Sequence, residues 1–192
     1  MARPREFDEK EALAAIRSTF WDRGYSATSV DDLVRATGLG KGSLYGAFGT
    51  KREMFVRALS EYCVAALTFA EARLHGDDAG ALGRLHAYVG VMVKGIVNSK
   101  RGCLLAKAIA ELAGDDPEID RMVSGFYRRY EDVLAGVIRQ SKPSRKAGDD
   151  DEAQRQASLL VAVLRGLESM GKGGVPAATL HGIAETALAA LR

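Results

Sequence analysis

The sequence predicts an all-α protein of about nine helices, with a small N-terminal three-helix domain and a larger helical C-terminal domain. Apolar residues recur every three to four positions through most of the 192 residues, which is the spacing of one helix face. No segment alternates apolar and polar residues for long enough to predict a strand. The four prolines fall between the periodic segments, where helices are expected to start or stop.

The first predicted helix covers residues 8–23. Asp8 can cap it, because a carboxylate at this position accepts hydrogen bonds from the free N–H groups of the first turn. Gly24 follows the helix, as expected where the chain needs a backbone conformation that glycine adopts most easily. The buried face is predicted from apolar residues at helical spacing, namely Leu13, Ile16 and Phe20.

Two short helices at residues 30–37 and 41–48 complete the small domain. Ser29 and Asp32 form a variant of the capping box, with an acid at the third helical position, and predict the start of the first of them. Gly38 ends that helix and supplies the turn before the next. Two short helices joined in this way predict a helix-turn-helix, an arrangement that many DNA-binding proteins use.

The remainder of the chain predicts longer amphipathic helices. Thr50 and Glu53 form a full capping box that opens a long fourth helix. The charged segment 142–151 is the clearest loop. We place the domain boundary after residue 52, between a small domain of residues 1–52 and a larger one of residues 53–192. Further helices are predicted at residues 79–99, 103–113, 117–141, 152–170 and 177–191.

The composition excludes several classes of protein. Hydrophobic residues make up 47% and charged residues 27% of the chain, which is typical of a globular protein and not of a disordered one. No apolar run approaches the ~18 residues of a membrane span, and no apolar signal segment follows Met1, so we expect a cytoplasmic protein with no membrane partner. The two cysteines and three scattered histidines predict no disulfide framework, no metal site and no cofactor.

Three segments of the small domain carry a resemblance to a known family, namely 20–33 (FWDRGYSATSVDDL), 36–45 (ATGLGKGSLY) and 48–51 (FGTK). The order of residues in these segments closely resembles the TetR family of bacterial transcriptional regulators. The resemblance implies an all-helical homodimer, in which residues 1–52 form the DNA-binding domain and residues 53–192 form a variable effector-binding and dimerisation domain. It also implies a regulator, most commonly a repressor, that binds a palindromic operator in double-stranded DNA. An unknown small-molecule effector would then release it.

The predicted DNA contacts come from the recognition helix at residues 41–48 and its surroundings. Lys41 and Ser43 can reach base edges or phosphates, and the Tyr45 hydroxyl can reach a phosphate one turn further on. Thr28 and Lys51 resemble the phosphate anchors of the family. The arm before the first helix, with its two arginines, either enters an adjacent minor groove or contacts nothing. The full set is Arg3, Arg5, Thr28, Lys41, Gly42, Ser43, Tyr45, Ala47 and Lys51.

Three positions depart from the family pattern. Gly40 stands where serine is common, which removes a hydroxyl that would cap the recognition helix. Gly46 and Ala47 replace a polar or aromatic pair, so base readout depends on few side chains, with Ala47 expected to meet a thymine methyl group. Gly42 lets the helix approach the groove closely. The operator sequence does not follow from the residues.

The helices between residues 79 and 141 are rich in large apolar and aromatic side chains. Such residues are more often plain core, but the family resemblance implies a ligand pocket among these helices. Met92 can adapt to different ligands, while His86, Tyr127 and Tyr130 can supply polar groups. The predicted lining residues are His86, Met92, Ile96, Cys103, Ile109, Phe126, Tyr127 and Tyr130.

Cys103 lies where a new helix is expected to begin, close to Lys100, Arg101 and Lys107. A helix N-terminus and nearby cations predict a lowered thiol pKa, which suits a sensor of oxidants or electrophiles. The segment 101–105 also resembles the Gly-Cys opening of one branch of the family, in which a small packing cysteine is the common alternative. Both interpretations stay open at this point.

The last two predicted helices have broad apolar faces, consistent with a four-helix interface across a two-fold axis. Burial within a single chain is the alternative explanation for the same pattern. The residues predicted for the dimer interface are Leu160, Val163, Leu164, Leu167, Leu180, Ala184 and Leu188.

The chain carries no sequence signature of catalysis. It has no Gly-rich phosphate loop, no G-x-S-x-G and no H-E-x-x-H segment, so we predict that it is not an enzyme. Two other classes are considered beside a regulator: an enzyme or carrier whose helix-turn-helix is only structural, and a helical protein-interaction module. Binding to promoter DNA distinguishes the regulator from both.

Overall fold

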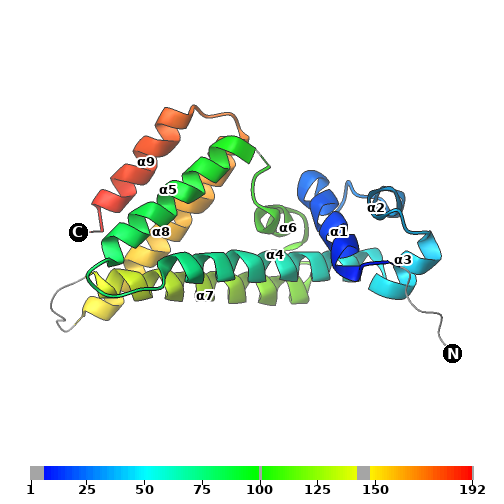
Figure 1. Cartoon of the computed structure of the whole chain (residues 1–192), viewed down its shortest axis with the longest axis horizontal. Helices are drawn as coiled ribbons and strands as arrows, with labels where there is room; N and C mark the ends of the chain where they lie inside the picture. The colour runs from blue at the N-terminus through cyan, green and yellow to red at the C-terminus, as the bar shows by residue number, and fades with distance from the viewer. Residues whose placement is uncertain (1–6, 100, 142–147, 192) are drawn as a thin grey trace. The chain divides into compact units, whose positions relative to one another are not determined.

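The computed structural model describes residues 7–99, 101–141 and 148–191. Within these residues the chain forms helices and no strand, so the predicted all-α class is confirmed (Figure 1). None of these helices has the length and hydrophobicity that a membrane span requires. The helices are α1 (Glu9–Arg23), α2 (Val30–Thr37), α3 (Lys41–Phe48), α4 (Lys51–Leu74), α5 (Ala81–Ser99), α6 (Leu104–Leu112), α7 (Pro117–Gln140), α8 (Asp149–Lys172) and α9 (Ala177–Ala189).

The N-terminal helix caps form as the sequence predicts. Asp8 accepts hydrogen bonds from the backbone N–H groups of the first turn of α1, at 2.7 and 3.2 Å. Ser29 and Asp32 form a reciprocal capping box at the start of α2. The backbone N–H of Thr50 donates to Glu53 Oε2 at 2.7 Å, and the N–H of Glu53 donates to the Thr50 hydroxyl at 3.3 Å. These local bonds fix where the first helices begin.

The predicted loop at 142–151 is wrong at its end, because α8 already begins at Asp149. The acids at 150–152 suit a helix start, since negative charge near a helix N-terminus is favourable. Residues 142–147, the rest of the predicted loop, lie outside the described residues.

The chain divides by its contacts into two compact units. The first unit consists of Met1–Val64 and Leu104–Met122, and the second consists of Ala65–Cys103 and Val123–Arg192. The first unit is therefore built from two separate stretches of sequence, and it contains α6 as well as α1 to α3. The functional boundary predicted after residue 52 stays a prediction, because contacts alone do not test it.

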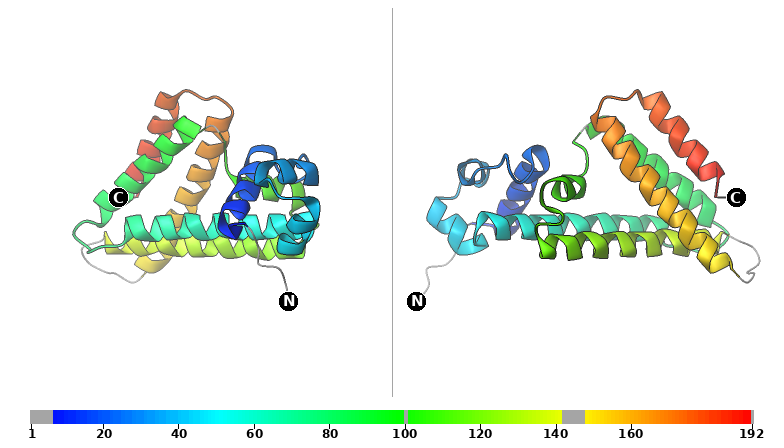
Figure 2. Two further views of the ribbon diagram at one scale, coloured as in Figure 1. Left: turned by 45° about the vertical axis from the view of Figure 1, so that its right-hand side comes forward. Right: turned by 180° about the vertical axis from the view of Figure 1, so that it is seen from behind.

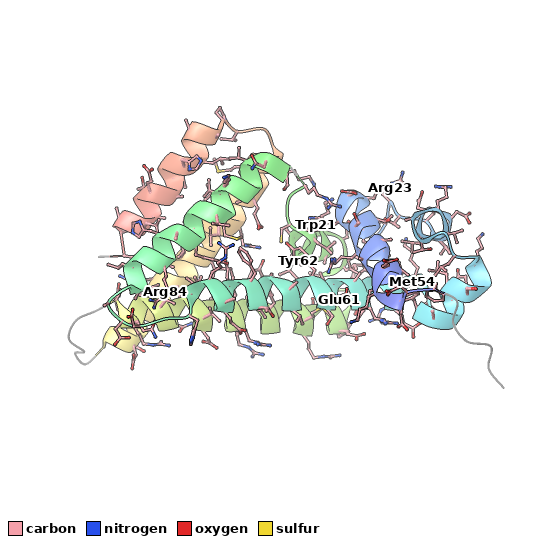
Figure 3. All side chains as sticks on the ribbon, in the orientation of Figure 1. Trp21, Arg23, Met54, Glu61, Tyr62 and Arg84 are labelled. Carbon is pink, nitrogen blue, oxygen red and sulfur yellow. The ribbon has the colours of Figure 1, made fainter. Side chains whose placement is uncertain are left out.

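Aromatic side chains form the centre of the first unit. Phe20 and Phe55 are fully buried and meet edge to face, with ring centroids 5.0 Å apart. Tyr25 packs on Phe55 at 5.1 Å. Trp21 of α1 meets Tyr62 of α4 in the same geometry, at 5.0 Å (Figure 3). These pairs hold α1 against α4, and edge-to-face contacts add to the burial of apolar area.

In the second unit, α5, α8 and α9 lie side by side, as both views of Figure 2 show. Leu85 of α5, Leu164 of α8 and Leu180 of α9 are fully buried. Gly171 permits the close approach of two of these helices, because a Cβ there would collide with the side chain of Ile96. The core of this unit is thus made by apolar faces of the same chain.

Candidate functional site

The helix α3 has one buried and one exposed face. Leu44 and Phe48 anchor it in the core of the first unit. Lys41, Ser43 and Tyr45 are exposed, with Tyr45 45% accessible to solvent. The predicted recognition residues therefore point outward, as contact with another molecule requires.

The turn before α3 depends on one glycine. Gly38 has a φ of 69° and a ψ of 4°, a left-handed conformation that few other residues adopt without strain. Its backbone N–H donates to Val34 O at 2.9 Å and closes the end of α2. This turn sets the direction in which α3 leaves α2.

The exposed face of α3 is nearly bare. A Cβ built on Gly40, Gly42 or Gly46 would meet no atom within 4 Å. Gly40 stands at the N-cap of α3 and offers no side-chain cap, as the departure from the family pattern predicts. The helix backbone can therefore come close to a neighbouring surface along the line from Gly42 to Gly46.

Arg57 of α4 fixes the far end of α3. Its guanidinium donates to the Ala47 carbonyl at 3.1 Å, forms an ion pair with Glu9 at 2.7 Å, and lies 4.9 Å from the centre of the Phe48 ring. One side chain thus ties the C-terminal turn of α3 to the first turn of α1. A cation is favourable at this end of a helix because of the exposed carbonyl groups.

Two neighbouring acids at the start of α2 have different partners. Asp32 accepts from Ser29 and pairs with Arg23 at 2.6 Å, and these hydrogen bonds to Ser29, together with the charge of Arg23, hold the pKa of its carboxyl well below the usual value. Asp31 instead lies 2.8 Å from Lys41 Nζ. The hydrogen bond to Asp31 raises the pKa of the Lys41 amine, so Lys41 is protonated at neutral pH.

The two predicted phosphate anchors differ in accessibility. Thr28 is 1% exposed, and its hydroxyl donates to the Gly24 carbonyl at 2.6 Å, so it holds the turn between α1 and α2. A phosphate contact by this hydroxyl would need it to leave that bond. Lys51 is half-buried, with Nζ 4.4 Å from the centre of the Tyr25 ring. The remaining predicted contacts, Arg3 and Arg5, lie outside the described residues.

Lys107 of α6 caps the end of α1. Its ammonium donates to the Trp21 carbonyl and, at 2.8 Å, to the Asp22 carbonyl. These carbonyls belong to the last turn of α1, which has no helical partners for them. The cation therefore satisfies the C-terminus of α1 from a helix more than 80 residues away.

Glu111, one turn further along α6, holds the turn that leads to α2. Its carboxylate accepts the backbone N–H of Tyr25 at 3.2 Å and of Ser26 at 2.6 Å. Gly24 has a φ of 84° and a ψ of 179°, and a Cβ there would collide with the Glu111 carboxylate. The close approach of Glu111 to this turn thus requires glycine at position 24.

Arg52 ties the start of α4 to the turn between α6 and α7. It forms a two-pronged pair with Asp116, at 2.7 and 2.8 Å, and reaches Glu118 at 2.9 Å. The hydrogen bonds from Arg52 are the main reason that the pKa of Asp116 falls to about 2. The carboxylate is therefore charged at every pH at which the protein is expected to work.

Sequence reasoning missed the residues that hold the recognition helix and its turn in place. Arg57, Lys107, Glu111 and Arg52 have partners at least ten residues away, and most are more than 45 away. Capping patterns within three or four residues give no signal for such contacts. An alignment of paired positions would be the signal that finds them.

The residues predicted for a ligand pocket do not all fall in one unit. Ile109 belongs to the first unit, and the others belong to the second. His86 is exposed, whereas Phe126, Tyr130 and Cys103 are buried. The three that remain, Met92, Ile96 and Tyr127, are half-buried.

Two of the predicted positions, Tyr130 and Cys103, belong to one buried polar network in the second unit. The hydroxyls of Tyr88 and Tyr130 lie 2.6 Å apart, and burial raises the pKa of both phenols, so both are neutral. Arg165 lies 5.7 Å from the centre of the Tyr130 ring, pairs with Glu168 at 2.9 Å and donates to Cys103 Sγ at 3.3 Å. Burial raises the pKa of Glu168, against the opposing effects of Arg165 and of a hydrogen bond from Cys103.

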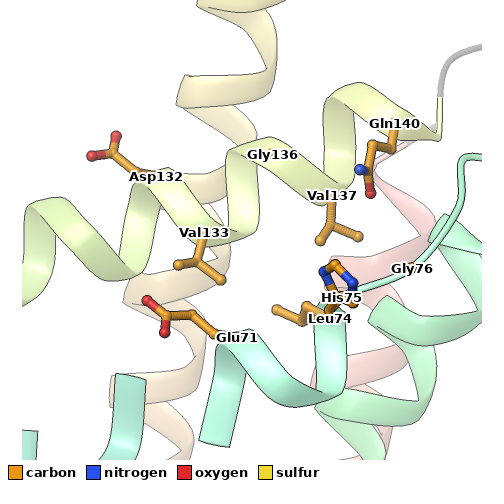
Figure 4. A pocket seen from close by; sticks show the side chains of 9 residues that line it. All are labelled: Glu71, Leu74, His75, Gly76, Asp132, Val133, Gly136, Val137 and Gln140. Carbon is orange, nitrogen blue, oxygen red and sulfur yellow. The ribbon is translucent and has the colours of Figure 1, made fainter. Parts of the chain in front are cut away.

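A separate groove of about 260 Å³ opens between the end of α4 and α7 (Figure 4). Its lining combines apolar side chains with two carboxylates, an imidazole and an amide. No residue predicted for the ligand pocket lines this groove. The lining residues are Glu71, Leu74, His75, Gly76, Asp132, Val133, Gly136, Val137 and Gln140.

Most residues predicted for the dimer interface are buried within the chain. This is the intrachain alternative named above, and it leaves these side chains little surface for a partner. The buried residues are Leu160, Leu164, Leu167, Leu180, Ala184 and Leu188, and Val163 is half-buried. On α8 the outward apolar surface comes instead from Leu159, which is 49% exposed, with Ala162 and Gly166 beside it.

Comparison with known sequences identifies relatives of the chain. Residues 6–58, which contain α1 to α3 and the first turns of α4, match the family described as bacterial regulatory proteins, tetR family. The chain is 26% identical to the HTH-type transcriptional repressor ComR of Escherichia coli (strain K12) over 188 residues, covering 97% of this chain and 90% of ComR. It is also 26% identical over 172 residues to the repressor BdcR of the same organism, covering 90% and 83%.

Solved structures give the same result. The TetR family transcriptional regulator CifR, as a cysteine mutant bound to 26-bp double-strand operator DNA, has a TM-score of 0.78 and 27% identity, covering 98% of this chain and 99% of CifR. These relatives are transcriptional regulators and not enzymes, which confirms the prediction that the chain is not an enzyme. Residues 6–58 therefore form a domain of the tetR family of bacterial regulatory proteins, and the chain over nearly its whole length has the fold of a transcriptional regulator of that family.

Proposed function

We propose that the chain is a ligand-responsive repressor that binds a palindromic operator as a homodimer and leaves it when a small-molecule effector binds. The observation that carries the proposal is α3: an exposed helix with a bare central face and polar residues beside it, anchored from behind by Leu44 and Phe48. A helix of this kind fits the major groove of B-form DNA, where base edges are read.

The relatives support repression as the effect on transcription and operator DNA as the partner. ComR and BdcR are named as repressors, and CifR was solved on operator DNA. Of the proposed contacts, Lys41, Ser43 and Tyr45 are exposed on α3, and Gly42 leaves room for the backbone to approach. Bacterial DNA lies in the cytoplasm, so such a protein would work there.

A dimer would read twice as many base pairs as a single recognition helix does. Two identical readers related by a two-fold axis match a palindromic site. The exposed Leu159, on the outer side of α8, supports a contact between copies at this helix. Sedimentation of the pure protein tests this part of the proposal, and a stable monomer would refute it.

The side chains that hold the helix-turn-helix in place suggest how an effector acts. Lys107 and Glu111 connect α6 to the end of α1 and to the turn before α2. A ligand that favours another position of α6 would therefore pull on the helix-turn-helix through these bonds. It shifts the equilibrium only if it binds the DNA-incompetent state more tightly.

The test is a mobility-shift assay with the DNA upstream of the gene that encodes the chain. We expect a retarded complex whose affinity falls steeply with salt, because phosphate contacts displace counterions. The same assay separates the two other classes: a carrier, an enzyme or a protein-interaction module would leave promoter DNA unshifted at every salt concentration.

Effector sensing through Cys103 has a specific observation in its favour. The Arg165 guanidinium donates to its sulfur, a contact that favours the thiolate, whereas the Glu168 carboxylate, which accepts a hydrogen bond from the thiol, opposes it. In the native protein we expect iodoacetamide to alkylate Cys103 about tenfold faster than Cys63, as measured by mass spectrometry of the peptides. Cys63 is the matched control, because both thiols are buried. Equal rates, or alkylation only after unfolding, would instead identify Cys103 as a packing residue.

A further inference from the structure

The one cation of the recognition helix α3, Lys41, already forms an ion pair with another residue of the chain. Lys41 is the only charged residue among the eight of α3. Its Nζ lies 2.8 Å from Asp31 Oδ1 on α2, although both side chains are well exposed, at 59% and 60%. The charge that the helix would offer to DNA is therefore neutralised by the neighbouring helix.

Asp31 differs from the acid beside it. Asp32 is occupied by the cap of α2, with Ser29, and by ion pairs with Arg23 and Arg35, and little of its side chain is exposed. Asp31 takes no part in that cap and reaches across to α3. Its contact with Lys41 is thus not needed to start α2.

Binding of a phosphate by Lys41 costs free energy as long as the ion pair between Asp31 and Lys41 stays intact. A phosphate oxygen within hydrogen-bonding distance of Nζ would lie within about 6 Å of the Asp31 carboxylate. Two negative charges at that distance repel each other. Lys41 has room to turn away from Asp31, because its side chain is 59% exposed.

We propose that Asp31 is a positioning residue that holds Lys41 back from DNA phosphates and so weakens binding to duplexes of unrelated sequence. The inference rests on the proposed function as a DNA-binding regulator. Unrelated DNA offers little beyond phosphate attraction, which the pair opposes. At a matching site, base contacts from α3 offset the loss of the ion pair. Asp31 thereby raises the ratio of specific to non-specific binding.

The experiment compares the wild-type protein with Asp31→Asn. The probes are a labelled random-sequence duplex and the labelled fragment upstream of its own gene, each over a range of salt concentrations. We expect affinity for the random duplex to rise about threefold per subunit, and about tenfold for a dimer, with a steeper salt dependence. The gain on the upstream fragment should be smaller, so that discrimination falls.

Three further variants serve as controls for this experiment. Asp31→Glu keeps the charge and should keep discrimination close to that of the wild type. In a Lys41→Ala background, Asp31→Asn should give no comparable gain, because the side chain that it releases is absent. Glu11→Gln removes another exposed acid of the first unit and controls for net charge. A folding defect would lower affinity, which is the opposite sign.

The outcomes separate this inference from the function on which it rests. An Asp31→Asn variant that binds the random duplex no more tightly would overturn it. So would an equal gain from Glu11→Gln or in the Lys41→Ala background, because general repulsion would then explain the effect. If the wild type ignores both duplexes even at low salt, the proposed function itself fails.

Discussion

A Gly46→Glu variant is expected to fold normally and to lose DNA binding. A Cβ at Gly46 meets no atom within 4 Å, so the glutamate side chain fits without disturbing the first unit. Its charge would face the phosphates and its bulk would occupy the bare face of α3. We expect affinity for the upstream fragment to fall at least about 100-fold in a fluorescence anisotropy titration.

Two control variants test whether a charged side chain on the exposed face of α3 causes this loss of DNA binding. Gly46→Ala adds only a methyl group and should stabilise α3 by about 0.5 kcal/mol, because glycine is a poor helix former, with little change in DNA affinity. Ala72→Glu adds the same charge to an exposed position of α4 in the second unit. If Ala72→Glu weakens binding as much as Gly46→Glu does, the face of α3 is not the contact surface.

A Gly24→Ala variant should show the largest loss of stability. Its φ of 84° with a ψ of 179° lies in a region that is almost exclusive to glycine. The Glu111 carboxylate can make room for the methyl group only by giving up its bonds to Tyr25 and Ser26. We expect the free energy of unfolding, from urea denaturation, to fall by about 3 kcal/mol.

Gly38→Ala serves for comparison, because Gly38 also has a positive φ, in the left-handed helical region, but nothing lies within 4 Å of a Cβ built there. It should cost about 1 kcal/mol, the cost of the left-handed conformation alone. In a Glu111→Ala background, the additional loss from Gly24→Ala should shrink, since the collision is gone. Equal losses at positions 24 and 38 would show that Glu111 does not press on this turn.

The sequence predicts helices well here because their signals are local. The caps of Asp8, Ser29 and Thr50 involve partners two or three residues away. Glycine at the ends of α1 and α2 likewise follows from what each turn requires of the backbone. Such features can be read from a few neighbouring residues, and most of the helix bounds follow from them.

The parts that could not be predicted depend on distant partners. The hydroxyl of Thr28 is a plausible phosphate anchor in the sequence, but the fold turns it inward to the Gly24 carbonyl. Glu111 looks like an ordinary surface acid of an amphipathic helix until Tyr25 and Ser26 are found beside it. The apolar faces around Leu164 and Leu180 indicate burial, but periodicity alone does not say which surface covers them.

The assembly of the first unit from two stretches of sequence limits how this protein can be cut and recombined. A fragment that ends after Val64 would leave out residues 104–122, and with them Lys107, Glu111 and Asp116. A chimaera that joins the first unit of this chain to the second unit of a relative must therefore include both stretches. Exchange of the N-terminal stretch alone would join surfaces that did not evolve as a pair.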